Sequence, residues 1–308
     1  MKTVIVIAGP TAVGKTSVAI QVARHFGTEI ISADSRQCFR ELNIGVARPS
    51  EEELALAKHY FIASHSIHDK ITAATFEQYA LLCLEMIFQR QDIAVVTGGT
   101  GLYIKALTEG MDIIPEVPDD IRKEIVEDYE KKGFSWLQEE VKNIDPLFAE
   151  KGEMQNPQRM MRALEIIKTT GQSILSFRSG MKRERAFKVI KLALELPREQ
   201  LHRNIHTRVD LMMEYGLKNE VQSLIGCQEL NALKTVGYQE LFDHFSGKIS
   251  LKDAVDAIKT HTRQYAKRQV TWFRKDQDYA WLPADAEKVI RNIEQSLSRD
   301  NGRTRNVE

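Results

Sequence analysis

The stretch Gly9-Pro10-Thr11-Ala12-Val13-Gly14-Lys15-Thr16 decides the fold of this 308-residue chain. It follows the apolar run at residues 4–8 and opens an apolar-periodic segment at residues 16–26, which predicts a strand, a glycine-rich loop and a helix. The spacing matches the phosphate-binding pattern G-x-x-x-x-G-K-[ST]. Loop N–H groups and the helix start attract an anion, Lys15 adds a full positive charge, and the Thr16 hydroxyl suits Mg²⁺ among phosphate oxygens. We therefore expect these eight residues to bind a phosphate or diphosphate group.

Composition and charge narrow the class of protein. The 43 Lys and Arg residues balance 43 Asp and Glu residues, so any nucleic-acid affinity must come from a local basic face. No run of about 18 apolar residues is present, so no membrane span is expected. The three isolated cysteines offer neither a disulfide set nor a metal spacing, which is typical of free thiols in a reducing cytoplasm.

A second predicted strand, at residues 29–32, ends just before Asp34. Side chains just past the carboxyl ends of strands line the ligand crevice of an open α/β sheet. We therefore expect Asp34 to lie near Lys15. The alternative is that Asp34 only caps the next turn or holds Mg²⁺ through water.

A third predicted strand, at residues 93–96, runs into the glycine-rich turn Thr97-Gly98-Gly99-Thr100-Gly101. Glycines at the end of a buried strand let a ligand approach the backbone, and Thr100 offers a hydroxyl there. A P-loop ATPase more often has an acidic residue at the end of such a strand, and this strand has none. The turn alone is a weak signal for a second ligand site.

The middle of the chain is predicted to be helical. Charged helical segments are expected at residues 119–132, ending at Gly133, and at residues 135–143. Asn156-Pro157 suits the start of a further helix, and Gly171 suits its end. Arg159 and Arg162 share one face of that helix, with Gln158 beside Arg159, and Met160 and Met161 belong to its packing side.

A buried strand resumes at residues 188–196 and completes the expected architecture. The predicted fold class is α/β, with a P-loop NTPase-like parallel sheet flanked by helices and a helical insertion. The predicted domains are the first part of the P-loop core at residues 1–114, a helical insertion at residues 115–185, and the rest of the core with basic C-terminal helices at residues 186–308.

Residues 259–275 carry six basic residues and no acidic one, interleaved with aromatic residues. Lys259, Arg263 and Lys267 recur at steps of four and form a basic stripe on a helix. Basic and aromatic residues on one element suit a nucleic-acid backbone. The alternative is a solvated helix with an apolar packing side.

Together, these motifs resemble the bacterial tRNA dimethylallyltransferase family, also called tRNA isopentenyltransferases. The matching stretches follow the family's order up to about residue 283 and are Gly9-Pro10-Thr11-Ala12-Val13-Gly14-Lys15-Thr16, Asp34-Ser35-Arg36-Gln37, Asn43-Ile44-Gly45-Val46-Ala47-Arg48-Pro49, Gly98-Gly99-Thr100-Gly101-Leu102-Tyr103, Asn156-Pro157-Gln158-Arg159-Met160-Met161-Arg162-Ala163-Leu164-Glu165, Val236-Gly237-Tyr238 and Tyr265-Ala266-Lys267-Arg268-Gln269-Val270-Thr271-Trp272-Phe273-Arg274.

The chain departs from the family pattern at a few positions. The family usually has Met where this chain has Arg36, an aliphatic residue and Tyr where it has Cys38-Phe39, and Thr where it has Val46. Residues 153–156 read Glu-Met-Gln-Asn instead of a sequence closer to His-Pro-Asn-Asp. These departures touch the expected tRNA-facing edge more than the phosphate loop, so the chemistry is expected to be intact.

The resemblance implies transfer of a dimethylallyl group from dimethylallyl diphosphate to N6 of adenosine 37, beside the anticodon of tRNAs that read codons beginning with U. An adenine amine is a poor nucleophile, and a general base contributes about 10² to 10⁴-fold. Asp34 is the expected base, and Thr100 resembles the family threonine that helps to hold the amine. By resemblance, Arg208 stabilises the diphosphate leaving group together with Lys15, the loop and Mg²⁺ held by Thr16.

The target base sits in an RNA loop and must be extruded to reach Asp34. The expected partners are dimethylallyl diphosphate and the anticodon stem-loop of tRNA, bound by a cytoplasmic monomer. The resemblance makes the insertion at residues 115–185 tRNA-facing. It places the tRNA contacts on Asp34, Ser35, Arg36, Gln37, Thr100, Arg122, Gln158, Arg159, Met160, Met161, Arg162, Lys234, Gly237, Tyr238, Lys267 and Arg268.

Three alternatives remain open. A P-loop nucleotide kinase shares the phosphate loop, but the basic late segment and the missing acidic strand end count against it. An adenylate isopentenyltransferase, which prenylates a free nucleotide, shares the N-terminal half, while residues 158–162 and 265–274 favour tRNA. The third alternative is a non-catalytic RNA-binding P-loop protein, in which replacing Asp34 has no measurable effect on activity.

Overall fold

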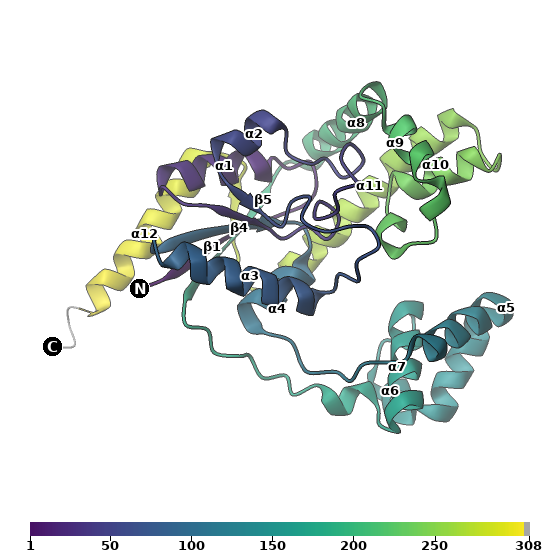
Figure 1. Ribbon diagram of the computed structural model, residues 1–308. Helices are drawn as coiled ribbons and strands as arrows, with labels where there is room; N and C mark the ends of the chain where they lie inside the picture. The colour runs from purple at the N-terminus through teal and green to yellow at the C-terminus, as the bar shows by residue number, and fades with distance from the viewer. Residues whose placement is uncertain (305–308) are drawn as a thin grey trace. The chain divides into compact units, whose positions relative to one another are not determined.

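The computed structural model describes residues 1–304 and the side chains of residues 1–299. The chain folds into two compact units (Figure 1). One unit consists of Met1–Glu109 and the chain from Glu184 onward, and the other is Gly110–Arg183. The boundaries expected from the sequence were residues 115 and 185. No helix in the described part of the chain is long and apolar enough to cross a membrane.

The first unit is built on a parallel sheet of six strands, counted over the described residues. The strand order is β3-β2-β4-β1-β5-β6, so β1 lies in the middle, and Thr3 pairs with Ile93 on one side and Lys188 on the other. This arrangement confirms the predicted α/β fold class. The strand bounds are Thr3–Ala8 for β1, Ile30–Ser32 for β2, His59–Tyr60 for β3, Ile93–Gly98 for β4, Lys188–Glu195 for β5 and Ala280–Pro283 for β6.

Helices cover both faces of the sheet. α1 (Lys15–His25) and α12 (Ala286–Thr304) lie on one face, and α3 (Ala73–Phe88) and α4 (Gly101–Glu109) lie on the other (Figure 1). Apolar side chains of α1 and α12 pack against β1 and β5 in one continuous core. Because the central strands β1, β2 and β4 are buried on both faces, they read as unbroken apolar runs in the sequence.

A second group of helices in this unit surrounds α11 (Leu251–Arg274), which packs against α4, α8 and α10. This packing brings the basic and aromatic segment of α11 to the end of the sheet where α4 begins. The other elements of the group are α8 (Arg198–Glu214), α9 (Leu217–Ser223), α10 (Tyr238–Phe245) and two short 3-10 helices at Ile225–Cys227 and Asn231–Leu233. The remaining helix, α2 (Glu51–Leu56), packs against α1.

The second unit is helical and has a core of its own. It contains α5 (Asp119–Ile144), α6 (Pro146–Lys151), α7 (Pro157–Thr170) and a 3-10 helix at Ile174–Phe177. Gly133 interrupts α5 with a φ of 81°, and Asn156 and Gly171 cap α7 as predicted. The buried core residues are Ile125, Leu137, Val141, Phe148, Met160, Met161, Ala163, Leu164, Ile166 and Ile174.

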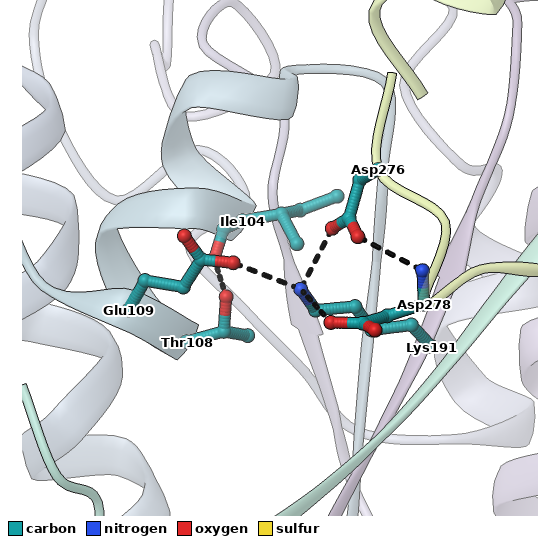
Figure 2. A network of polar contacts seen from close by, with 6 residues as sticks. All are labelled: Ile104, Thr108, Glu109, Lys191, Asp276 and Asp278. Carbon is teal, nitrogen blue, oxygen red and sulfur yellow. Dashed lines mark hydrogen bonds and ion pairs between the residues drawn. The ribbon is translucent and has the colours of Figure 1, made fainter. Parts of the chain in front are cut away.

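A buried lysine fastens the end of α4 to the sheet (Figure 2). Lys191 Nζ on β5 lies 3.0 Å from Glu109 Oε1, 2.7 Å from Asp276 Oδ2 and 3.7 Å from Asp278 Oδ2. Burial lowers the pKa of Lys191, but the hydrogen bonds that its ammonium group donates to Asp276 and Glu109 outweigh this effect, so that the pKa is raised. Glu109 is therefore held in place at the point where the chain leaves the first unit.

Candidate functional site

The phosphate loop connects β1 to α1 in a backbone conformation that few residues adopt. Gly9, Ala12 and Gly14 have φ values of 145°, 63° and 100°. A Cβ on Gly9 would lie 2.9 Å from the carbonyl oxygen of Leu194, so the loop has no room for a side chain there. No side chain caps the N-terminus of α1, so its first N–H groups remain available to an anion.

Two cations and one carboxylate meet at this loop. Lys15 Nζ donates to the carbonyl of Pro10 at 2.7 Å, and Arg208 Nη1 donates to Thr11 Oγ1 at 3.3 Å. Burial and the neighbouring Arg208 lower the pKa of Lys15 to about 7, against the opposing effect of Asp34. Burial also lowers the pKa of Arg208. Both charged side chains therefore lie where an anionic group would relieve their desolvation and mutual repulsion.

Asp34 stands just past the end of β2, and its two carboxylate oxygens have different roles. Oδ1 accepts hydrogen bonds from the backbone N–H groups of Arg36 at 2.9 Å and Gln37 at 3.2 Å. Asp34 therefore does cap the following turn, as one interpretation of the sequence expected. Oδ2 accepts no hydrogen bond from the described residues. This oxygen is therefore available to a ligand.

The second glycine turn packs closely against the Asp34 turn. Thr100 Oγ1 accepts from the backbone N–H of Ser35 at 3.1 Å, and the Thr100 N–H donates to Ala33 at 3.2 Å. A Cβ on Gly98 would lie 2.1 Å from the carbonyl oxygen of Ala33. The hydroxyl of Thr100 and the carboxylate of Asp34 are thus held on neighbouring turns by backbone contacts.

α11 adds an aromatic residue to this site. Burial and the nearby Asp34 raise the pKa of Tyr265 to about 12, and Tyr265 also hydrogen-bonds Thr100. The guanidinium of Arg268 lies 5.8 Å from the centre of the Tyr265 ring. Lys267 is exposed beside them. Of the two tRNA-binding residues expected on α11, Arg268 therefore lies by a tyrosine that is close to Asp34 and Thr100.

The first part of the expected basic stripe is not free. Lys259 Nζ lies 2.6 Å from Asp210 Oδ1, and Arg263 Nη2 donates to Thr260 Oγ1 at 3.0 Å. α8 therefore supplies Lys259 with a counter-charge that the spacing on α11 alone does not reveal, and contact of the stripe with a nucleic acid stays a prediction.

Glu220 on α9 organises the loop that follows the Asp34 turn, and sequence reasoning missed it. Its carboxylate accepts from the N–H groups of Asn43, Ile44 and Gly45 at 2.8 to 3.2 Å. The same loop supplies the carbonyls of Val46 and Ala47, which accept from Gln37 Nε2 at 3.2 and 2.9 Å. Because Gln37 also donates its N–H to Asp34, this network reaches the candidate base.

Two expected tRNA-contacting residues, one in the turn before α10 and one at the first position of this helix, are buried. Tyr238 is fully buried against Gly45, and the Gly237 N–H donates to Glu240 at 2.7 Å. A side-chain contact between Tyr238 and tRNA is therefore wrong, because the ring fills the space beside Gly45. Lys234 in the same turn is exposed and lies 3.8 Å from Glu229.

The expected tRNA-binding residues of the second unit differ in exposure and in their ion-pair partners. Gln158 and Arg159 are exposed, and Arg159 is paired with Glu153. Arg162 Nη1 lies 2.7 Å from the buried Glu165, which is also 3.8 Å from Arg122.

Met160 and Met161 belong to the core of the second unit. Their expected side-chain contact with tRNA is therefore wrong, because these side chains form the packing side of α7.

The donor set for Mg²⁺ is small. Thr16 provides a hydroxyl oxygen at the start of α1, and Asp34 provides a carboxylate oxygen on the neighbouring turn. Among residues 1–304, no group of three or more His, Cys, Asp and Glu side chains is placed to hold a metal. Mg²⁺ prefers oxygen ligands and keeps several waters, so this site fits an ion that takes most of its ligands from a bound phosphate group and water.

The chain is similar to known prenyl-transferring enzymes. Residues 37–276 match the family model for IPP transferase. The tRNA dimethylallyltransferase of Christiangramia forsetii is 49% identical over 294 residues, which cover 95% of this chain and 97% of the relative.

Two solved structures share the fold over most of the chain. A tRNA delta(2)-isopentenylpyrophosphate transferase of Staphylococcus epidermidis is 32% identical with a TM-score of 0.70, covering 97% of this chain and 100% of that one. A eukaryotic dimethylallyltransferase acting on tRNA is 27% identical with a TM-score of 0.76, covering 94% of this chain and 75% of that one.

Proposed function

This chain belongs to the tRNA dimethylallyltransferases, the IPP transferase family of tRNA-modifying enzymes, and from that premise we propose that it transfers the dimethylallyl group of dimethylallyl diphosphate to N6 of adenosine 37 in tRNA. The acceptor tRNAs read codons that begin with U. We place the enzyme in the cytoplasm as a monomer. The observation that carries the proposed mechanism is the division of the Asp34 carboxylate into a capping oxygen and an oxygen without a protein partner.

In the proposed reaction, the N6 lone pair attacks C1 of the dimethylallyl group and forms a C–N bond. The C1–O bond breaks, and its electron pair leaves with the diphosphate. The proton of N6 moves to Oδ2 of Asp34, while Oδ1 keeps its two backbone hydrogen bonds. Because Oδ1 is fixed by the turn, the carboxylate does not have to reorient when it takes the proton.

The developing charge on the diphosphate is stabilised by groups that are already in position. The loop N–H groups, Lys15 and Arg208 converge at the start of α1. Interactions of this kind accelerate transfer because they are stronger with the leaving diphosphate than with the bound substrate. Mg²⁺ held at Thr16 would supply further positive charge to the diphosphate oxygens.

The acceptor base reaches the site as an extruded nucleotide. Thr100 and Tyr265 lie beside Asp34 and offer a hydroxyl and an aromatic ring to an adenine. Lys267, Arg268 and Lys234 supply exposed positive charge in the first unit, and Arg159 supplies it in the second. Cationic side chains at these positions suit the phosphates of an anticodon stem-loop.

Mass analysis of nucleosides tests the proposal. Unmodified tRNA is incubated with the protein, Mg²⁺ and dimethylallyl diphosphate. The wild type is compared with Asp34→Asn, whose amide oxygen still accepts the backbone hydrogen bonds but is a poor base. Asp285→Asn is the matched control, because Asp285 Oδ1 accepts from the N–H groups of residues 287 and 288 in the same way at 3.1 and 3.2 Å.

We expect a prenyl mass on adenosine with the wild type and Asp285→Asn, and a rate lowered by about 10² to 10⁴-fold with Asp34→Asn. Full activity of Asp34→Asn would exclude Asp34 as the base. Prenylation of AMP without prenylation of tRNA would favour an adenylate isopentenyltransferase. Consumption of ATP with no prenyl mass on either acceptor would favour a nucleotide kinase.

A further inference from the structure

Gln269 on α11 joins the two glycine turns of the site through both ends of its amide. Its Oε1 accepts from the backbone N–H of Thr11 in the phosphate loop at 2.8 Å. Its Nε2 donates to the carbonyl of Gly99, beside Thr100, at 2.9 Å. The residue is only 6% exposed, so water does not replace either bond if the amide is lost.

Because Gly99 and Gly101 of the second turn have no side chains, α11 can pack directly against the backbone of this turn. A Cβ on Gly99 would lie 2.1 Å from Gln269 Nε2 and 3.6 Å from the carbonyl oxygen of Gly9. A Cβ on Gly101 would lie 2.1 Å from Trp272 Cδ1. Residues 269 and 272 are one helical turn apart and lie on the same face. This face of α11 therefore rests directly on the backbone of the turn, which itself approaches the phosphate loop.

The side-chain amide of Gln269 suits this position because it can donate one hydrogen bond and accept another. A glutamine has an acceptor and a donor on one rigid plane, whereas a carboxylate only accepts and an ammonium only donates. One turn offers an N–H and the other offers a carbonyl, so both groups of the amide are needed. A side chain without either group would leave two buried backbone groups unpaired.

We propose that Gln269 is a positioning residue that fixes the distance between the diphosphate site and the acceptor-amine site. The inference rests on the proposed function, in which the phosphate loop holds the donor and the Thr100 turn holds the acceptor. Direct transfer needs the reacting atoms about 3 to 3.5 Å apart, and an error of about 1 Å costs about 10²-fold in rate. Gln269 connects the two turns whose separation sets that distance.

The first test replaces Gln269 with methionine, which keeps the length and removes both hydrogen bonds. Gln138→Met is the matched control, because it removes a glutamine Nε2 bond of 2.9 Å to the carbonyl of Met154 in the second unit. The affinity for inorganic diphosphate is measured by calorimetry without tRNA, and melting temperatures are recorded. We expect Gln269→Met to weaken diphosphate binding by about fivefold and Gln138→Met to leave it unchanged.

The second test is a double-mutant cycle with Thr100→Ala, read from kcat on tRNA. Gln269→Met should lower kcat by about 30-fold in the wild type and by less than about threefold in the Thr100→Ala background, because the residue acts through the turn that carries Thr100. Gln269→Asn, whose amide is too short to reach both turns, should lower kcat less than Gln269→Met and provides a folded variant if methionine is not tolerated.

Equal losses of kcat in both backgrounds would overturn the inference, as would unchanged diphosphate affinity with a lower melting temperature alone. If the wild type transfers no prenyl group to tRNA, the proposed function fails, but the diphosphate affinities of Gln269→Met and Gln138→Met still decide whether Gln269 shapes the phosphate loop.

Discussion

Tyr238 and Glu220 form a hydrogen bond of 2.6 Å, in which the phenol of Tyr238 donates to Oε1 of the carboxylate. The same carboxylate accepts three N–H groups from consecutive residues of the loop at residues 43–45. One side chain of α9 thus fastens the start of α10 to the loop that supports Gln37. The pKa of Tyr238 is raised by burial and by the charge of Glu220, so the phenol stays protonated and continues to donate.

We predict that Glu220→Gln lowers the free energy of unfolding by about 2 to 3 kcal/mol, because the new amide N–H₂ faces N–H donors. Tyr238→Phe should lower it by about 1 to 2 kcal/mol, since one buried hydrogen bond is lost. Equilibrium denaturation in urea measures both. Glu229→Gln, at a glutamate whose side chain is 86% exposed, is the control and should change the free energy by less than about 0.5 kcal/mol. Equal effects of Glu220→Gln and Glu229→Gln would contradict the prediction.

We predict that diphosphate binding takes up a proton at pH 8. With its pKa lowered to about 7, Lys15 is mostly neutral at pH 8 before the anion binds. The anion raises this pKa, so the amine becomes protonated on binding, while below about pH 6 it is already charged and takes up nothing.

Calorimetry in buffers of different ionisation enthalpy measures this uptake, which should approach one proton at pH 8. In the Lys15→Arg variant the side chain stays charged at both pH values. Any proton uptake that this variant shows therefore comes from the diphosphate itself. The same uptake in the wild type and in Lys15→Arg would show that Lys15 is not the group that titrates.

We predict that the double variant Arg159→Ala, Arg162→Ala binds tRNA about tenfold more weakly, with a less steep salt dependence. Each arginine is paired with a glutamate in the unbound protein, so its charge is positioned but is available to phosphates. Filter binding at several salt concentrations measures the affinity and the slope. Lys123→Ala, Lys131→Ala removes two cations of α5 that likewise pair with a glutamate, and should have a smaller effect. Unchanged affinity of the arginine variant would remove α7 from the tRNA surface.

We predict that Lys191→Met destabilises the first unit by about 1 to 3 kcal/mol, because it removes the cation shared by the half-buried carboxylates of Glu109 and Asp276 (Figure 2). Thermal and chemical unfolding both report this loss. Asp278→Ala should cost less than about 1 kcal/mol, since Asp278 is 68% exposed and 3.7 Å from the lysine. The exposed Lys288→Met provides a second control. A small effect of Lys191→Met would show that the network is not a source of stability.

Local signals made much of the fold predictable from the sequence. The phosphate loop, the apolar runs that became β1, β4 and β5, and the caps Asn156 and Gly171 all depend on neighbours in the chain. The short strands β3 and β6 carry no such signal, because residues 59–60 and 280–283 are half exposed and join the sheet edges through pairing alone.

The candidate site was less predictable where partners lie far apart in sequence. Gln269 binds Thr11 across 258 positions, and Glu220 binds Ile44 across 176. Neither residue type is unusual on a helix, so periodicity treats both as ordinary polar positions. The burial of Tyr238 likewise depends on Gly45, which leaves room for the ring.

Because β1 lies in the middle of the sheet, its two neighbouring strands are synthesised at different times. Its partner on one side, β4, follows within the first 98 residues, but its partner on the other side, β5, begins only at Lys188. At translation rates of about 5 to 20 residues per second, the β1 edge therefore waits roughly 4 to 15 seconds while residues 110–183 leave the ribosome. An unpaired strand edge is a site of aggregation, so a nascent chain stalled at this stage is a substrate for chaperones. The second unit has its own core and can fold during that interval, before the sheet that precedes it is complete.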